Sequence, residues 1–470
     1  MCKQTPFKDN NATLRLNSTD SSLVEDEERR RQRADQLYSQ GWDCFERRQL
    51  LLALECFETA LGVYQRYNEE TFLSVACCRM SIGCIYQQQG RLDDALRSHS
   101  RALETFEWLD PDSLNTAASY NNIALVFQDQ GRFADALRLY NKSRVIKERL
   151  VPHSLDLAMT YNNIGNVFQS QGKLSFALEM HQKTRVIREQ LAPESLDMAS
   201  TFTNTGNVLL TQGKFTEALA LYDQGRMIQE RLAPESLDLA HTYNNVGIIL
   251  EEQGRFEQAL RMHHKSRQLK QTVTPDSLHL ASTYNNIGVV LFHQQRHDEA
   301  STMYEMAKNI QRRLGPDTLD LAFTLNNIGE LFLVGRQQAE RAFGLFEEAR
   351  VIIAAQAPDS PEYGDVLRNI GNVLKEQGRL EQAMRLHEQA CVLLENSVPN
   401  SPVLGKTLRD MSEILQRQHR YHESLELVQR CLSILEQPHI GIHTAQHPVY
   451  LKAKSQEAEL LAVVKKSESR

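Results

Sequence analysis

Long apolar runs are missing from this sequence of 470 residues, which nowhere approaches the roughly 18 consecutive apolar residues of a membrane-spanning helix. The N-terminal residues also lack the apolar core of a secretory signal. A basic excess is missing too: the formal net charge is −7, whereas nucleic-acid-binding chains usually carry a positive field. We therefore expect no membrane insertion and no nucleic-acid partner, and we expect a cytoplasmic protein.

Motifs for metal, redox or catalytic chemistry are equally scarce. The eight cysteines form no C-x-x-C pair, and this pattern predicts reduced thiols rather than a disulfide framework or a zinc site. His439, His443 and His447 are four residues apart, but nearby prolines and a glycine interrupt any helix there, so we predict no metal site. No phosphate-binding loop, dinucleotide fingerprint or nucleophile elbow occurs. We expect no enzyme and no cofactor.

What the sequence has instead is one pattern repeated at a fixed interval. An asparagine recurs every 41 residues, and the last copy follows after 42. Self-similarity at this period is typical of a solenoid, in which each unit stacks only on its neighbours. We call these seven residues the asparagine ladder: Asn122, Asn163, Asn204, Asn245, Asn286, Asn327 and Asn369.

Each copy of the repeat predicts two amphipathic helices. In one copy, Ser154 is placed to cap a first helix, Gly172 ends it, and a second helix runs from Leu174 to about Leu191. The buried stripe of the first helix has the spacing i, i+3, i+4, i+7. The recurring small residue of that stripe and the second-helix alanine are predicted to be packing positions. The capping hydroxyls recur at Ser113, Ser154, Ser195, Ser236, Ser277, Thr318 and Ser360.

These residues resemble the tetratricopeptide pattern, which reads Gly206, Leu209, Ala218, Tyr222 and Gly225 in one copy. The 41-residue version, with a P-[DE]-[ST]-L-D loop and an N-N-I-G helix, is similar to the repeats of kinesin light chains. The resemblance implies an all-α, right-handed α-solenoid (superhelix) of about ten tetratricopeptide repeats. We expect the repeats over residues 29–438, a disordered segment over 1–28, and a linker, capping helix and charged tail over 439–470.

The resemblance also implies where a partner binds. If the small residue of the first helix is position 8, positions 2, 5, 6, 9, 12 and 13 face the concave groove in which such arrays bind peptides. The asparagine ladder is position 6, and an amide can bridge the N–H and C=O of an extended peptide. Asn166, Asn207 and Asn372 at position 9 are further candidates. The alternative is that the asparagines bond to the protein's own backbone or helix ends.

We therefore predict a non-enzymatic scaffold or adaptor that binds an extended segment of an unknown protein partner. Two alternatives stay open. One is a motor-cargo adaptor like kinesin light chains, although no apolar heptads precede the repeats. The other is an architectural homo-oligomer with a self-occupied groove. The lysines and arginine of a chaperone-tail clamp are missing from the groove positions, so that partner class is rejected.

Two further sets recur on the second helices. The first is a set of basic residues, which could bind an acidic peptide. We expect instead that each pairs with an acid such as Asp156 or Asp197 at a repeat junction. The members of this basic set are Arg144, Arg185, Arg226, Arg267, Lys308 and Arg350. Histidines occupy the aromatic site of four second helices, and we interpret them as core residues rather than metal ligands. They are His99, His181, His263 and His387.

Overall fold

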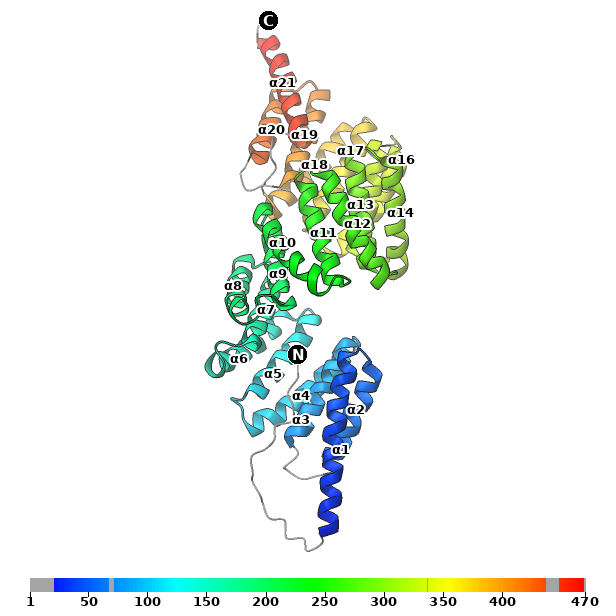
Figure 1. Ribbon diagram of the computed structural model, residues 1–470. Helices are drawn as coiled ribbons and strands as arrows, with labels where there is room; N and C mark the ends of the chain where they lie inside the picture. Colours follow the sequence, from blue (N-terminus) through cyan, green and yellow to red (C-terminus); the bar gives the residue numbers. More distant parts are fainter. Residues whose placement is uncertain (1–20, 67–71, 336, 400, 437–447, 469–470) are drawn as a thin grey trace. The chain divides into compact units, whose positions relative to one another are not determined.

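The computed structural model of the chain describes residues 21–66, 72–335, 337–399, 401–436 and 448–468, and all regular structure in these ranges is helical (Figure 1). The chain divides into two compact units, residues 1–193 (unit 1) and 194–470 (unit 2). Successive helices pack in pairs as hairpins, four in unit 1 and six in unit 2, and a final helix follows. The prediction of an all-α solenoid of about ten tetratricopeptide-like repeats is confirmed.

The helices of unit 1 are α1 (Ser21–Glu46), α2 (Leu50–Tyr64), α3 (Phe72–Gln88), α4 (Leu92–Leu109), α5 (Leu114–Asp129), α6 (Phe133–Leu150), α7 (Leu155–Ser170) and α8 (Leu174–Leu191). The first hairpins of unit 2 are α9 (Leu196–Thr211), α10 (Phe215–Leu232), α11 (Leu237–Glu252), α12 (Phe256–Val273), α13 (Leu278–His293) and α14 (His297–Leu314). Unit 2 continues with α15 (Leu319–Glu330), α16 (Ala339–Gln356), α17 (Pro361–Glu376), α18 (Leu380–Ser397), α19 (Pro402–Arg417), α20 (Tyr421–Leu435) and α21 (Pro448–Glu468).

Serine hydroxyls begin the first helices as the sequence predicts. The Ser154 hydroxyl accepts a hydrogen bond from the Leu157 amide at 3.1 Å, and equivalent bonds cap α5, α9, α11, α13 and α17. Each bond satisfies an amide that has no partner inside its helix. Thr318 differs, because its hydroxyl donates to the Gly315 carbonyl at 2.8 Å and makes no cap bond. That member of the predicted set is wrong.

The small residue of each first helix lies under a large ring of the second. A Cβ atom added to Gly288 would lie 2.5 Å from the Tyr304 ring, and one added to Gly247 would lie 2.5 Å from the His263 ring. Both distances are shorter than van der Waals contact, so only glycine allows these helices to approach so closely. His99, His181, His263 and His387 are all fully buried at this site, which confirms their predicted place in the core.

The residue that lengthens one repeat to 42 lies in a π-helical turn, Leu331–Gly335, which continues α15. In the preceding hairpin, Gly288 and the left-handed turn residue Gln295 are seven positions apart. Gly329 and the equivalent Gln337 are eight apart. A π-helical turn accommodates one extra residue without ending the helix, so the insertion is absorbed there.

The two ends of the array are helical wherever the structure describes them. Helix α1 begins at Ser21, inside the segment 1–28 that the sequence predicts to be disordered. Val449, Ala453 and Leu460 of α21 pack into the apolar core of α19 and α20. The boundaries predicted at 28 and 438 stay predictions, because residues 1–20 and 437–447 lie outside the described residues.

Candidate functional site

The first helices of unit 2 enclose a cavity of about 1210 Å³. Its walls come mainly from α11, α13, α15, α17 and α19, through the positions that the repeat register assigns to the groove. Positions 9, 12 and 13 supply many of the side chains, among them Ile248, Glu252, Phe292, Val334 and Lys375. Lys406 on α19 lies within electrostatic range of Glu252 on α11, so the first and last of these helices approach each other around the cavity.

Aromatic rings and carboxylates meet where α11 and α13 line the cavity. Phe256 stacks on His293 with ring centroids 5.3 Å apart, and His293 Nε2 lies 4.0 Å from Glu251 Oε1. Burial, together with the neighbouring Glu252 carboxylate, raises the pKa of Glu251 to about 8, although the Lys406 ammonium opposes this shift. Among the described residues, no lysine or arginine pairs with either glutamate within 4.0 Å.

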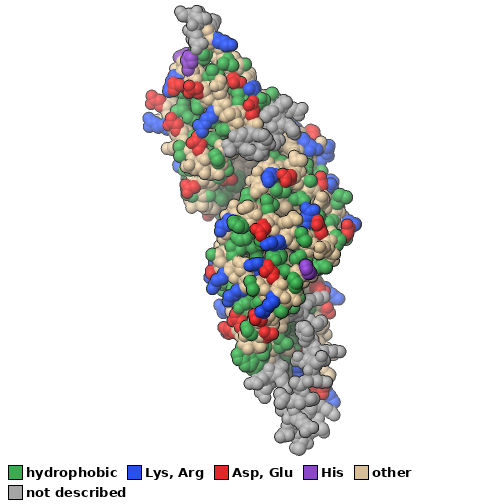
Figure 2. Space-filling view, turned by 90° about the vertical axis from the view of Figure 1, so that its left-hand side faces the viewer, with side chains coloured by type: hydrophobic (Ala, Val, Ile, Leu, Met, Phe, Trp, Pro, Cys, Tyr) green, Lys and Arg blue, Asp and Glu red, His purple; other side chains and the backbone are tan. Residues whose placement is uncertain are grey.

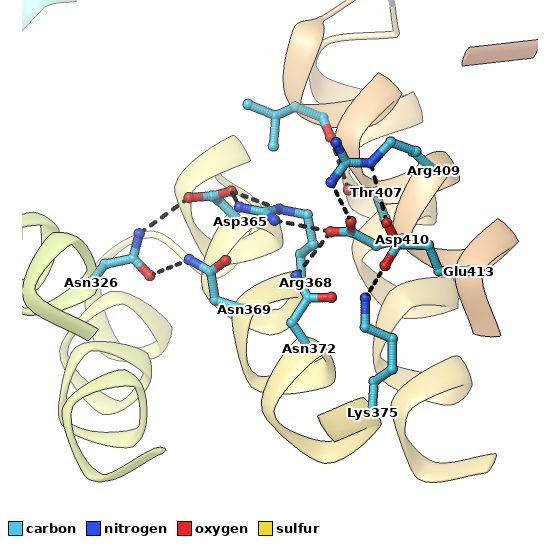
Figure 3. A network of polar contacts seen from close by, with 11 residues as sticks. Asn326, Asp365, Arg368, Asn369, Asn372, Lys375, Thr407, Arg409, Asp410 and Glu413 are labelled. Carbon is cyan, nitrogen blue, oxygen red and sulfur yellow. Dashed lines mark hydrogen bonds and ion pairs between the residues drawn. The ribbon is translucent and has the colours of Figure 1, made fainter. Parts of the chain in front are cut away.

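A buried network of ion pairs connects α17 and α19 at another wall of the cavity (Figure 3). Arg368 donates from Nη2 to Asp365 Oδ1 at 2.8 Å and from Nη1 to Asp410 Oδ2 at 3.0 Å. Asp410 also accepts from Asn372 Nδ2 at 2.8 Å and from Arg409 Nη2 at 2.9 Å. The Arg368 and Asp410 side chains are only 7% and 2% exposed. Burial alone would raise the pKa of Asp410, but the two guanidinium groups hold it far below its usual range.

The asparagine ladder bridges neighbouring repeats in unit 2. Asn286 Nδ2 donates to Asn244 Oδ1 on the preceding first helix at 3.2 Å. Asn327 Nδ2 donates in the same way to Asn285 Oδ1 on α13 at 3.1 Å. Asn369 Nδ2 donates to Asn326 Oδ1 on α15 at 2.9 Å. These bonds join side-chain amides of neighbouring repeats, whereas the structural alternative expected partners in the backbone or at helix ends. The peptide-clamp interpretation stays a prediction, and Asn369 is the ladder residue that lines the cavity.

The remaining candidate asparagines are distributed over both units. Asn245 Nδ2 donates to Asn207 Oδ1 at 2.9 Å, and the same oxygen accepts from the Tyr222 hydroxyl at 2.5 Å. Asn372 lines the cavity and donates a hydrogen bond to Asp410. The structure therefore brings Asn369 and Asn372 to the cavity and leaves the other predicted residues outside its lining. Asn122, Asn163, Asn166 and Asn204 are half-buried on α5, α7 and α9.

Five of the six residues of the basic set pair with acids of the same helix, whereas Arg267 has no ion pair among the described residues. Arg144 Nη1 lies 2.9 Å from Glu148 Oε1, and Arg226 likewise contacts Glu230 at 2.9 Å. Glu148 in turn accepts from the Tyr161 hydroxyl of the next repeat at 2.5 Å. Pairing is thus the role that we expected, but the partner of Arg144 is Glu148 and not Asp156. An acid one turn along the helix is closer than one in the next repeat.

Sequence reasoning missed the acidic and aromatic part of the cavity. Glu251 and Phe292 both lie at position 12, so the repeat register itself was a usable signal. The register does not show which repeats meet across the cavity, because that depends on small rotations summed over several hairpins. The predicted absence of a metal at His439, His443 and His447 concerns positions outside the described residues.

The described surface carries charges of both signs. On the face seen in Figure 2, lysine and arginine side chains lie among aspartates and glutamates, and the described residues form no broad basic area there. Within the part of the chain that the structure describes, no helix is both long enough and apolar enough to cross a membrane.

Comparisons with known proteins agree with this architecture. Models of the tetratricopeptide repeat family match residues 37–107, 82–149, 115–190, 156–226, 197–272, 279–350 and 365–401. These matches cover well over half of the sequence, and the chain belongs to the tetratricopeptide repeat family. They indicate no enzyme family. The search of curated proteins gave no match.

Two solved structures share the fold at low identity. The apo form of the quorum sensor NprR from B. thuringiensis is 14% identical, with a TM-score of 0.58 over 79% of this chain and 99% of that chain. The apo form of RapI is 12% identical, with a TM-score of 0.58 over 77% and 97%. Nearly identical TPR-like repeats of a putative kinesin light chain from Podosopora anserina are 17% identical, with a TM-score of 0.37 over 43% and 98%.

Proposed function

We propose that this chain is a non-enzymatic scaffold or adaptor that binds an extended segment of a partner protein in the cavity of unit 2. One observation carries the proposal: the groove positions of five successive first helices enclose a single cavity of about 1210 Å³. Binding sites for ligands are typically concave and largely apolar, with a few polar groups that fix orientation. A segment of extended chain suits a cavity whose walls come from consecutive repeats.

The proposal predicts that filling the cavity abolishes binding. Val334 lines the cavity and is 62% exposed, so Val334→Trp adds bulk there without disturbing the core. Peptides selected from a random displayed library on the full chain are expected to bind this variant at least about tenfold more weakly in fluorescence anisotropy, a loss of roughly 1.4 kcal/mol.

Val351→Trp is the matched control, because Val351 is 63% exposed and lies outside the cavity lining. Equal binding to both variants would contradict the proposal. A mass that rises with concentration in the parent and not in Val334→Trp would instead make a second copy of the chain the occupant.

We further propose that the asparagine ladder binds the same segment beside the cavity lining, on the first helices that form the cavity walls. Asn286 and Asn327 each use one amide N–H to bridge repeats, and the rest of each amide has no partner among the described residues. An asparagine amide carries two donors and an acceptor, so one residue can hold a neighbouring repeat and a peptide backbone together.

The double variant Asn286→Ala/Asn327→Ala therefore should lose both stability and affinity. Two lost bonds amount to about 2 kcal/mol of unfolding free energy, measured by urea denaturation. Affinity for the selected peptides is expected to fall about tenfold. Reduced stability with unchanged affinity would leave these asparagines with a structural role alone.

A further inference from the structure

Three carboxylates of the cavity lack nearby cations. Glu251, Glu252 and Glu330 all line it, and none is within 4.0 Å of a lysine or arginine among the described residues. Lys406 and Arg368 act on these carboxylates only from a greater distance. Burial raises the pKa of Glu251 because the carboxylate has little water and no paired cation.

The basic groups of the cavity, by contrast, are mostly neutralised by their own neighbours. The Arg368 guanidinium is held between Asp365 and Asp410. Lys375 pairs with Glu413 at 2.5 Å. These cations have little remaining attraction for an acidic ligand, since their charges are already paired within the protein.

The aromatic rings beside these carboxylates also favour a cationic group. Phe256 and Phe292 line the cavity beside Glu251, and aromatic faces attract cations. Lysine and arginine side chains carry several N–H donors and no acceptor, which matches carboxylates that lack a paired cation. Apolar lining residues such as Leu333 and Val403 suit apolar neighbours in the bound segment.

We infer that the bound segment carries a lysine or arginine flanked by apolar residues, and that its cationic group binds to Glu251 and Glu330. The inference rests on the proposed function, because it names the chemistry of the segment that this cavity takes. Charge complementarity thus selects a basic-apolar segment of a partner protein as the occupant.

The test begins with random displayed peptides selected on the full chain. Those that bind the parent and fail to bind Val334→Trp are kept as cavity-binding peptides. Lysine or arginine is expected at one enriched position, and norleucine at that position should weaken binding about 10- to 100-fold. Glu251→Gln/Glu330→Gln should weaken the parent peptide similarly and the norleucine peptide little. Glu347→Gln is the control, since Glu347 lies outside the cavity lining and pairs with Arg350.

Cavity-binding peptides without an enriched cation, or equal binding to Glu251→Gln/Glu330→Gln, would overturn this inference and leave the proposed function standing. If no peptide distinguishes Val334→Trp from the parent, the proposed function and this inference both fail.

Discussion

Replacing Asp410 by alanine is expected to destabilise the C-terminal repeats by about 3–5 kcal/mol. The carboxylate is 2% exposed and accepts hydrogen bonds from Arg368, Asn372 and Arg409, so its removal leaves a buried guanidinium with one partner fewer. Uncompensated charge in a protein interior is costly because water no longer solvates it. Urea denaturation followed by circular dichroism measures the change.

An exposed pair of the same chemistry provides the control. Arg420 and Glu423 are both about half-exposed, and Glu423→Ala is expected to cost less than about 1 kcal/mol. Changing both partners, as Arg368→Met/Asp410→Leu, should recover only part of the loss, because the Arg368 charge is removed with its partner while Asp365 and Arg409 each lose one ion pair. A cost for Asp410→Ala as small as that for Glu423→Ala would show that the network of Figure 3 is not buried in solution.

Stability should also fall steeply as the solution becomes acidic. His99, His181, His263 and His387 are fully buried, and their ring nitrogens have no partners among the described residues. Burial lowers the pKa of His99, His181 and His387 to about 4 and that of His263 to about 3. The unfolded chain, with histidine pKa values near 6.5, therefore binds more protons than the folded chain between about pH 6.5 and 4.

This contribution is intact above pH 6.5 and is lost as the pH falls toward 4. Each histidine is expected to account for about 1.4 kcal/mol per pH unit in that window. Replacing all four with tyrosine, the residue of the equivalent sites Tyr140 and Tyr222, should flatten the dependence of melting temperature on pH. The control is His153→Gln at an exposed position, which should leave the slope unchanged. Parallel pH profiles for parent and quadruple variant would contradict buried, neutral histidines.

Much of the fold could be predicted from the sequence because its determinants are local. Ser154 caps its helix, and Gly172 takes a left-handed φ of 70° at the turn, as their positions in the repeat predict. The interval of 42 residues likewise signalled an insertion, although the π-helical turn Leu331–Gly335 that absorbs it could not be told from a longer loop. Residue type and spacing are sufficient for such features, since they depend on a single turn of helix.

The candidate site was only partly predictable. The groove side of the first helices follows from the repeat register, and it does line the cavity. Asp410 occupies position 6 of α19, the register position of the asparagine ladder, but its bond to Arg368 crosses from one repeat to the next. The approach of Lys406 to Glu251 joins residues on the first and last of five successive first helices. Such contacts depend on the accumulated curvature of the hairpins, which no single repeat encodes.

The most direct test of partner binding in the cavity is photo-crosslinking on the full chain. A peptide selected on the parent would carry a benzophenone side chain, and mass spectrometry would identify the attached residue. The account predicts crosslinks on cavity-lining residues such as Ile248, Phe292 and Leu333, and their loss in Val334→Trp. Crosslinks on the outer faces of the second helices, at exposed Val351 or Val392, and persisting in that variant, would contradict it.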